Sequence, residues 1–163
     1  MSKKYFWICY FLPYLLLSIQ GYSQEITPAI KWQKTIGGSG ADVLFAMVQT
    51  PDNGYIVGGY SASNISGEKT ANNKGGNDYW LLKLDSTGNI QWQKTIGGNG
   101  EDILSDISLC EDGGYIVSGT STSGINGDKT DTCRDDPGSF LGGDLWLLRL
   151  SSTGNILWQK TYG

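Results

Sequence analysis

The sequence predicts an all-β protein built from tandem repeats. Three observations carry this prediction: a motif that returns along the chain, short runs rich in β-branched and aromatic residues, and clusters of turn residues between those runs. Glycine accounts for 24 of the 163 residues, more than twice its usual share of about 7%. Because the glycines follow no collagen period, they indicate many turns between short strands.

The repeat is defined by the motif Trp-Gln-Lys-Thr. It begins at Trp32, again at Trp92, which is 60 residues later, and again at Trp158, after another 66 residues. Two further motifs recur between these copies: Gly-Tyr-Ile-Val at 54–57 and 114–117, and Asp-x-Trp-Leu-Leu at 78–82 and 144–148. Self-similarity over so long a period is the signature of a repeat architecture.

Each repeat contains four predicted strands, which we expect to form one antiparallel sheet. The turns support this, because Asp-Asn-Gly at 52–54 and Asp-Gly-Gly at 112–114 tolerate the positive φ of tight hairpins. The expected strands are 42–49, 54–61, 78–85 and 89–96 in the first repeat, and 102–109, 114–121, 144–150 and 155–162 in the second. A ninth strand is expected at 30–36, with no preceding strands of its own repeat.

The third strand of the repeat indicates how the sheets pack. Alternation along 78–84 places apolar side chains on both faces: Trp80, Leu82 and Leu84 on one, Tyr79 and Leu81 on the other. Four-stranded sheets that are buried on both faces and repeated in tandem are typical of β-propeller blades. We therefore expect propeller-like blades at 42–101 and 102–163, preceded by an orphan strand and linker at 24–41.

The motifs resemble those of a family of secreted bacterial propeller-like repeats. Units of that family read Gly-Gly-Tyr-Ile-Val, then Asp-Tyr-Trp-Leu-Leu-Lys-Leu-Asp, then Gly-Asn-Ile-x-Trp-Gln-Lys, and the matching segments here include 113–117, 78–85 and 88–94. The resemblance covers nearly the whole chain after residue 23. It implies a propeller-like fold in a secreted or cell-surface protein, and it implies no defined activity.

Propellers close with roughly four to eight blades, whereas this sequence encodes two blades and one strand. We expect the chain to be the N-terminal part of an incomplete propeller, so that its partners include further blades of the same or another chain. Two alternatives are open: a two-sheet sandwich that stands alone, and an oligomer that completes the ring.

Residues 1–23 are predicted to be a secretory signal peptide. Lys3 and Lys4 precede an apolar stretch over 5–19, which is short for a membrane span, and small residues stand at the cleavage-site positions 21 and 23. The alternative is an uncleaved N-terminal anchor helix, against which a proline within the stretch argues. Removal of the signal leaves no expected transmembrane segment and predicts a secreted or cell-surface location.

Composition excludes several classes of function. The sequence has no histidine, so it can form neither a Ser-His nor a Cys-His nucleophile pair, and it lacks the commonest ligand of transition metals. Its 12 basic and 16 acidic residues give a formal charge of −4. Because nucleic-acid binding requires a basic surface, we expect no nucleic-acid partner.

The candidate binding site is the sheet edge from which the long loops at 62–77 and 122–143 leave, because loops of this length are usually functional or disordered. The candidate ligand-binding residues there are Asp78, Asp102, Asp144 and Phe140. Three interpretations of the carboxylates are open. They hydrogen-bond nearby backbone N–H groups, they bind calcium, or two of them form a glycosidase pair. The calcium candidates are Asp128, Asp131, Asp135 and Asp136.

The cysteines predict a disulfide. Cys9 lies in the signal peptide, which leaves Cys110 and Cys133 as an even pair in an oxidising compartment. Both are absent from the first repeat, and Cys133 lies where the second repeat carries its insertion. We expect a bond between Cys110 and Cys133 that fixes the longer loop, although this requires the loop to fold back along the sheet.

The function that these features favour is an exported, non-catalytic binding or scaffold module, with a glycan or protein ligand at the long-loop edge. No cofactor is expected other than calcium. The alternative is a carbohydrate-active hydrolase of the endoglucanase kind that uses an Asp/Glu carboxylate pair.

Overall fold

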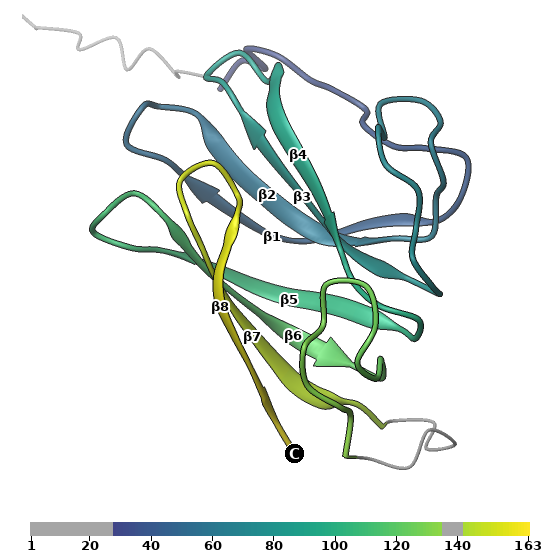
Figure 1. Cartoon of the computed structure of the whole chain (residues 1–163). Helices are drawn as coiled ribbons and strands as arrows, with labels where there is room; N and C mark the ends of the chain where they lie inside the picture. Colours follow the sequence, from purple (N-terminus) through teal and green to yellow (C-terminus); the bar gives the residue numbers. More distant parts are fainter. Residues whose placement is uncertain (1–27, 135–141) are drawn as a thin grey trace, which may run out of the picture. The chain divides into compact units, whose positions relative to one another are not determined.

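The computed structural model describes residues 28–134 and 142–163. The chain divides into two units, 1–30 and 31–163, and the described residues of the first unit, 28–30, are exposed and outside regular structure. The second unit contains two four-stranded antiparallel sheets, each in sequence order (Figure 1). The first sheet comprises β1 (Asp42–Gln49), β2 (Tyr55–Ser61), β3 (Asp78–Leu84) and β4 (Ile90–Ile96); the second comprises β5 (Asp102–Leu109), β6 (Tyr115–Ser121), β7 (Asp144–Leu150) and β8 (Ile156–Tyr162). The all-β prediction is confirmed.

All eight strands of the two repeats were predicted, and their ends differ from the expected ends by at most one residue. The differences arise because glycine, asparagine and Asp85 belong to the turns instead of extending the strands. Thr50 N donates to Gly54 O at 2.9 Å, and Asp85 N donates to Asn89 O at 2.9 Å. The turns contain the positive φ values that such hairpins require, 61° at Asn53 and 80° at Gly88.

A β-bulge recurs in the first strand of each sheet. In β1 it lies between Leu44 and Ala46, opposite Gly59. A Cβ atom on Gly59 would lie 1.8 Å from the carbonyl oxygen of Val43, so only glycine fits here. The second sheet has the same bulge opposite Gly119.

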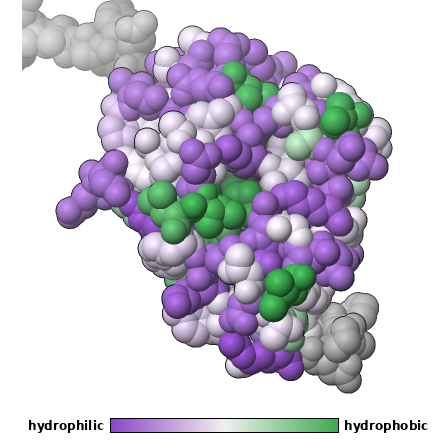
Figure 2. Space-filling view, viewed as in Figure 1, coloured by the Kyte–Doolittle hydropathy of each residue, from purple (hydrophilic) through white to green (hydrophobic). Residues whose placement is uncertain are grey.

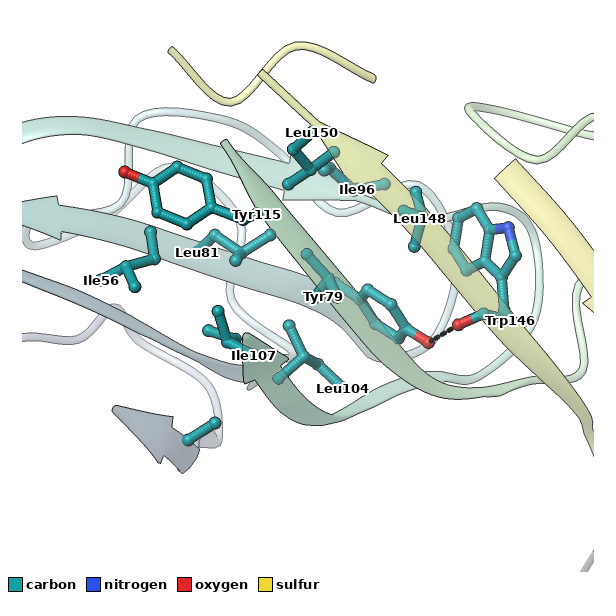
Figure 3. Packing of buried hydrophobic residues seen from close by; sticks show 12 residues of the cluster. Ile56, Tyr79, Leu81, Ile96, Leu104, Ile107, Tyr115, Trp146, Leu148 and Leu150 are labelled. Carbon is teal, nitrogen blue, oxygen red and sulfur yellow. Dashed lines mark hydrogen bonds between the residues drawn. The ribbon is translucent and has the colours of Figure 1, made fainter. Parts of the chain in front are cut away.

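The two sheets pack face to face, with β5 in contact with β1, β2 and β3. We call the face of the first sheet that meets the second its back face, and its opposite face the front face. Tyr79 of β3 is fully buried between the sheets, where its ring lies 5.2 Å from that of Trp146 and its hydroxyl donates to Trp146 O at 3.3 Å (Figure 3). The core contains, from the first sheet, Ala46, Ile56, Tyr79, Leu81 and Ile96, and from the second, Leu104, Ile107, Tyr115, Val117, Trp146, Leu148 and Leu150.

The outer face of the second sheet is more polar than the back face that it repeats. Asp106 and Ser118 stand at the positions that Ala46 and Gly58 hold in the first sheet. Asp106 is exposed. At the position of the buried Tyr79, the second sheet has Leu145, which is 45% exposed. This face is therefore suited to solvent.

The strand that the sequence predicts at 30–36 is not formed. Within the described residues, no hydrogen bond joins the backbone of 31–36 to another part of the chain. The same motif forms β4 at 90–96, where β3 lies alongside it. The prediction is wrong because a strand requires a neighbour, and 31–36 has none among residues 28–134 and 142–163. The described part of the chain also has no helix long and apolar enough to cross a membrane.

Candidate functional site

Three of the predicted site residues are buried at the long-loop edge. Asp78 and Asp102 are 0% exposed and Asp144 is 1% exposed, and each begins a strand. One carboxylate oxygen of each accepts a hydrogen bond from a nearby backbone N–H. Lys74 N donates to Asp78 at 2.6 Å, and Arg134 N donates to Asp144 at 2.8 Å. These contacts correspond to the first interpretation of the carboxylates, in which they hold the start of each strand to the adjoining loop.

Asp102 lies in a similar network between the sheets. Its Oδ2 atom accepts hydrogen bonds from Gly98 N at 2.7 Å and from Ser123 Oγ at 2.8 Å. Gly97 brings Asp102 close to Asp78, because a Cβ atom on this glycine would lie 2.0 Å from Asp78 Oδ1 and 2.9 Å from Asp102 Oδ2. A glycosidic bond could not reach either carboxylate, because both are shielded from solvent.

The pKa of Asp78 predicts how its environment affects stability. Burial raises this pKa to about 6, and the hydrogen bond from Lys74 N acts in the opposite direction. An unfolded chain releases the same proton near pH 4. Between about pH 4 and pH 6 the folded state therefore holds a proton that the unfolded state has lost. The stability that this proton gives is fully present below about pH 4 and is lost as the pH rises through 6.

We expect Asp78→Asn to remove this pH dependence. The unfolding free energy of the wild type, minus that of the variant, should fall by on the order of 3 kcal/mol between about pH 4 and pH 7. Urea titrations across this range measure it. Asp106→Asn is the control, because that side chain is exposed on β5, and its difference from the wild type should stay flat. A flat difference for Asp78→Asn as well would contradict this account.

Of the four calcium candidates, the structure describes Asp128 and Asp131, and each is paired with a cationic side chain. Asp128 forms an ion pair with Lys74 and accepts a hydrogen bond from Gly97 N at 3.1 Å. Asp131 pairs with the Arg134 guanidinium at 3.2 Å. Within 28–134 and 142–163, no group of three or more metal-ligating side chains comes together. Asp135, Asp136 and the ligand-binding candidate Phe140 lie outside the described residues.

The predicted disulfide is wrong: Cys110 and Cys133 are both free thiols. Cys110 lies in the β5–β6 turn, next to the pairing of Leu109 with Tyr115. Cys133 precedes Arg134, which binds the opposite end of β7 through Asp144. The two ends of β7 are roughly 20 Å apart at about 3.3 Å per residue, whereas a disulfide requires Cα atoms within about 7 Å.

The sequence interpretation missed two buried lysines. Lys69 and Lys129 are 1% and 2% exposed, and they lie over the rings of Trp80 and Trp146. The Lys69 ammonium donates to Thr95 Oγ1 at 2.9 Å, and burial lowers its pKa. Their recurrence at the same place in both long loops is the signal that could have found them. Both lysines tie a loop to its own sheet, so the long-loop edge is occupied by internal contacts.

The described surface is hollowed on the front face of the first sheet. A groove of about 260 Å³ lies there, between residues of β1, β2 and β3 and the side chains of Trp32, Lys34 and Ile36. The face seen in Figure 2 is mostly hydrophilic, with separate apolar patches, whereas the groove is lined mainly by apolar side chains.

The groove lies over positions that are core positions in the second sheet. The front face carries Leu44, Met47, Tyr55, Val57, Trp80, Leu82 and Leu84, which correspond in the repeat to Leu104, Ile107, Tyr115, Val117, Trp146, Leu148 and Leu150. Leu44 and Met47 are 58% and 61% exposed, whereas Leu104 and Ile107 are 0% and 2% exposed. Val57, Trp80, Leu82 and Leu84 are buried in a cluster of their own, against which Ile36 packs. The front face therefore has the composition of a packed interface, and its exposed part lies along β1, where no second sheet covers it within the described residues.

The segment 31–36 lies on the first sheet as β4 lies on the second. The Trp32 ring meets Tyr55 at 6.0 Å and 65°, and the Trp92 ring of β4 meets Tyr115 at 6.1 Å and 63°. Lys34 Nζ donates to Asn89 Oδ1 at 3.0 Å, and Lys94 makes the same bond in the second sheet, at 3.2 Å. The segment thus repeats the contacts of an edge strand of a preceding sheet.

Comparison with known proteins gives this chain no family. No protein-family model matches it, and no curated protein is significantly similar to it. The structure and its internal repeat are therefore the basis for assigning a function.

Proposed function

We propose that this chain is an exported, non-catalytic protein-binding module, and that its two sheets are consecutive propeller-like blades. Its binding surface is the front face of the β1–β4 sheet. The observation that carries the proposal is the exposure of Leu44 and Met47 at positions whose counterparts, Leu104 and Ile107, are buried. Exposed apolar side chains beside an apolar groove mark a protein interaction site more often than a site for a polar ligand.

The long-loop edge is not the proposed binding surface. The candidate carboxylates Asp78, Asp102 and Asp144 are buried, and each accepts a backbone N–H hydrogen bond. No observation favours the hydrolase alternative, because a carboxylate pair must lie on both sides of an accessible glycosidic bond. An export role is consistent with the predicted signal peptide and remains part of the proposal.

The front face can be tested with the dye 8-anilinonaphthalene-1-sulfonate and with insoluble polysaccharides. We expect the purified chain to bind the dye, and Leu44→Asp to abolish most of the fluorescence because it places a charge in the groove wall. Leu145→Asp is the matched control, since Leu145 is also exposed but lies on the outer face of the second sheet. Its dye fluorescence should stay near that of the wild type.

The same preparations separate protein binding from glycan chemistry. We expect neither retention on cellulose or chitin nor release of reducing sugar. Retention that survives Leu44→Asp would place a glycan site elsewhere and overturn the proposal, as would equal dye binding by all three proteins. Sugar release that is lost in Asp78→Asn would establish the hydrolase instead.

A further inference from the structure

The front face and the segment 31–36 make the contacts of a sheet interface from one side only within the described residues. We propose that they bind a third sheet of the same repeat type, whose third strand pairs antiparallel with residues 32–36. This inference rests on the proposed function and names the class of its protein partner. The partner is recognised by backbone pairing, by a side-chain hydrogen bond to Gln33 and by a tyrosine that enters the groove.

The backbone N–H and C=O groups of residues 32–36 are the first feature that a partner could pair with. In the first sheet, β3 pairs with β4 in the register Tyr79 with Ile96, Trp80 with Thr95, and Lys83 with Trp92. The segment 32–36 has the same sequence as 92–96 and the same anchoring contacts, yet its backbone has no hydrogen-bond partner among the described residues. A segment whose backbone N–H and C=O groups are unpaired in this way can accept an added strand. The expected register places a partner tyrosine opposite Ile36.

The side chain of Gln33 is open in the same way. Gln93 accepts a hydrogen bond from the Trp80 indole at 3.0 Å, and Gln159 accepts one from the Trp146 indole at 2.9 Å. In the described structure, no hydrogen bond is formed by the side chain of Gln33, the third copy of this glutamine. Thr95 accepts a hydrogen bond from the buried Lys69, but Thr161, its copy in the second sheet, has no hydrogen-bond partner within the described residues. The donor that both sheets share is therefore the tryptophan indole, and a partner that carries the repeat's tryptophan satisfies Gln33.

The groove matches a tyrosine of the partner. Between the two sheets of this chain, Tyr79 fits over Gly119, where a Cβ atom would lie 2.6 Å from the tyrosine hydroxyl. The same hydroxyl donates to Trp146 O. On the front face the counterparts of Gly119 and Trp146 are Gly59 and Trp80, and both line the groove. A tyrosine of the partner's third strand would therefore occupy the groove and donate to Trp80 O.

The outer face of a second copy of this chain does not meet these requirements. It carries Leu145 in place of the tyrosine and Asp106 in place of Ala46. It also carries Ser118 in place of Gly58, where a Cβ atom would lie only 2.8 Å from the Ile107 side chain of the facing sheet. Packing of this face on another front face would bury an unpaired carboxylate and crowd the interface. The partner must instead resemble the back face of the first sheet.

Peptides of this chain test the proposal by fluorescence anisotropy. The first probe is residues 77–85, which contain Tyr79, with a labelled trilysine tail for solubility. The matched probe is residues 143–151, which contain Leu145 at the same position. We expect the purified chain to bind the first probe saturably, and to bind the second roughly tenfold more weakly, because it lacks the hydroxyl and the ring. Amide hydrogen exchange should show protection of residues 32–36 on binding.

Two variants of the chain localise the binding. Thr35→Pro removes the backbone N–H of residue 35 and disfavours a paired strand at this position. Leu44→Asp places a charge on the front face. We expect each to abolish binding of the 77–85 probe, whereas Leu145→Asp retains it. Equal affinity for the two probes, binding without protection of 32–36, or occupation of the face by a second copy that excludes the probe would overturn the inference. If no probe binds while the dye still does, the third sheet is wrong and the binding module stands.

Discussion

Replacing Leu104 with alanine is expected to lower the free energy of unfolding by about 2–5 kcal/mol, whereas Leu44→Ala is expected to cost less than about 0.5 kcal/mol. The two leucines occupy the same repeat position beside the same β-bulge. Leu104 is fully buried in the core between the sheets, and Leu44 is 58% exposed on the front face. The difference arises because truncation of Leu104 leaves a cavity, whereas truncation of Leu44 leaves solvent.

Urea unfolding monitored by tryptophan fluorescence measures both variants. The pair Ile107→Ala and Met47→Ala repeats the comparison at a second position, since Ile107 is 2% exposed and Met47 is 61% exposed. Equal losses at the two members of either pair would show that another part of the molecule covers the front face in solution. The wild type and variants should have similar m-values, because none of these changes alters the area exposed on unfolding by much.

Replacing Asp102 with alanine is expected to destabilise the protein by about 2–5 kcal/mol, because two buried donors lose their acceptor. These donors are Gly98 N and Ser123 Oγ, which bind the same carboxylate oxygen. The change also separates the β4–β5 connection from the long loop that follows β6. Thermal and urea unfolding near pH 7 give the loss.

Asp106→Ala is the control for this change. Asp106 lies four residues further along β5 and is exposed, and its side chain forms no hydrogen bond within the described residues. It should change the unfolding free energy by less than about 0.5 kcal/mol. If Asp102→Ala leaves stability intact, Asp102 is not held by these bonds, and a role in ligand binding becomes the better interpretation.

The strands could be predicted from the sequence because local signals agreed in two copies. Asn53 and Gly88, for example, mark turns whose φ values only a few residue types adopt. The segment 31–36 could not be predicted correctly, because its sequence is that of β4 and the difference lies in a neighbouring strand. Local sequence determines which residues can form a strand, and the presence of a neighbour determines whether they do.

The candidate site was less predictable than the fold. The recurrence of Asp78 as Asp144 showed that the carboxylate matters to the repeat, but sequence alone does not separate a ligand from a buried acceptor of backbone N–H bonds. The disulfide prediction was wrong because it required the long loop to fold back along the sheet, whereas Arg134, next to Cys133, binds Asp144 at the end of β7 opposite Cys110. The front face could be recognised as a candidate binding surface only from the structure, which shows that the two sheets cover the Leu104 position and leave the Leu44 position exposed.

The polar residues on the outer face of the second sheet have a consequence for how the molecule behaves at high concentration. Head-to-tail contacts that do not close on themselves generate filaments. A chain with one adhesive apolar end and an opposite end complementary to it would polymerise without limit. Asp106 and Ser118 make the outer face of the second sheet a poor complement to the front face. We therefore expect that copies of these two sheets do not polymerise head to tail.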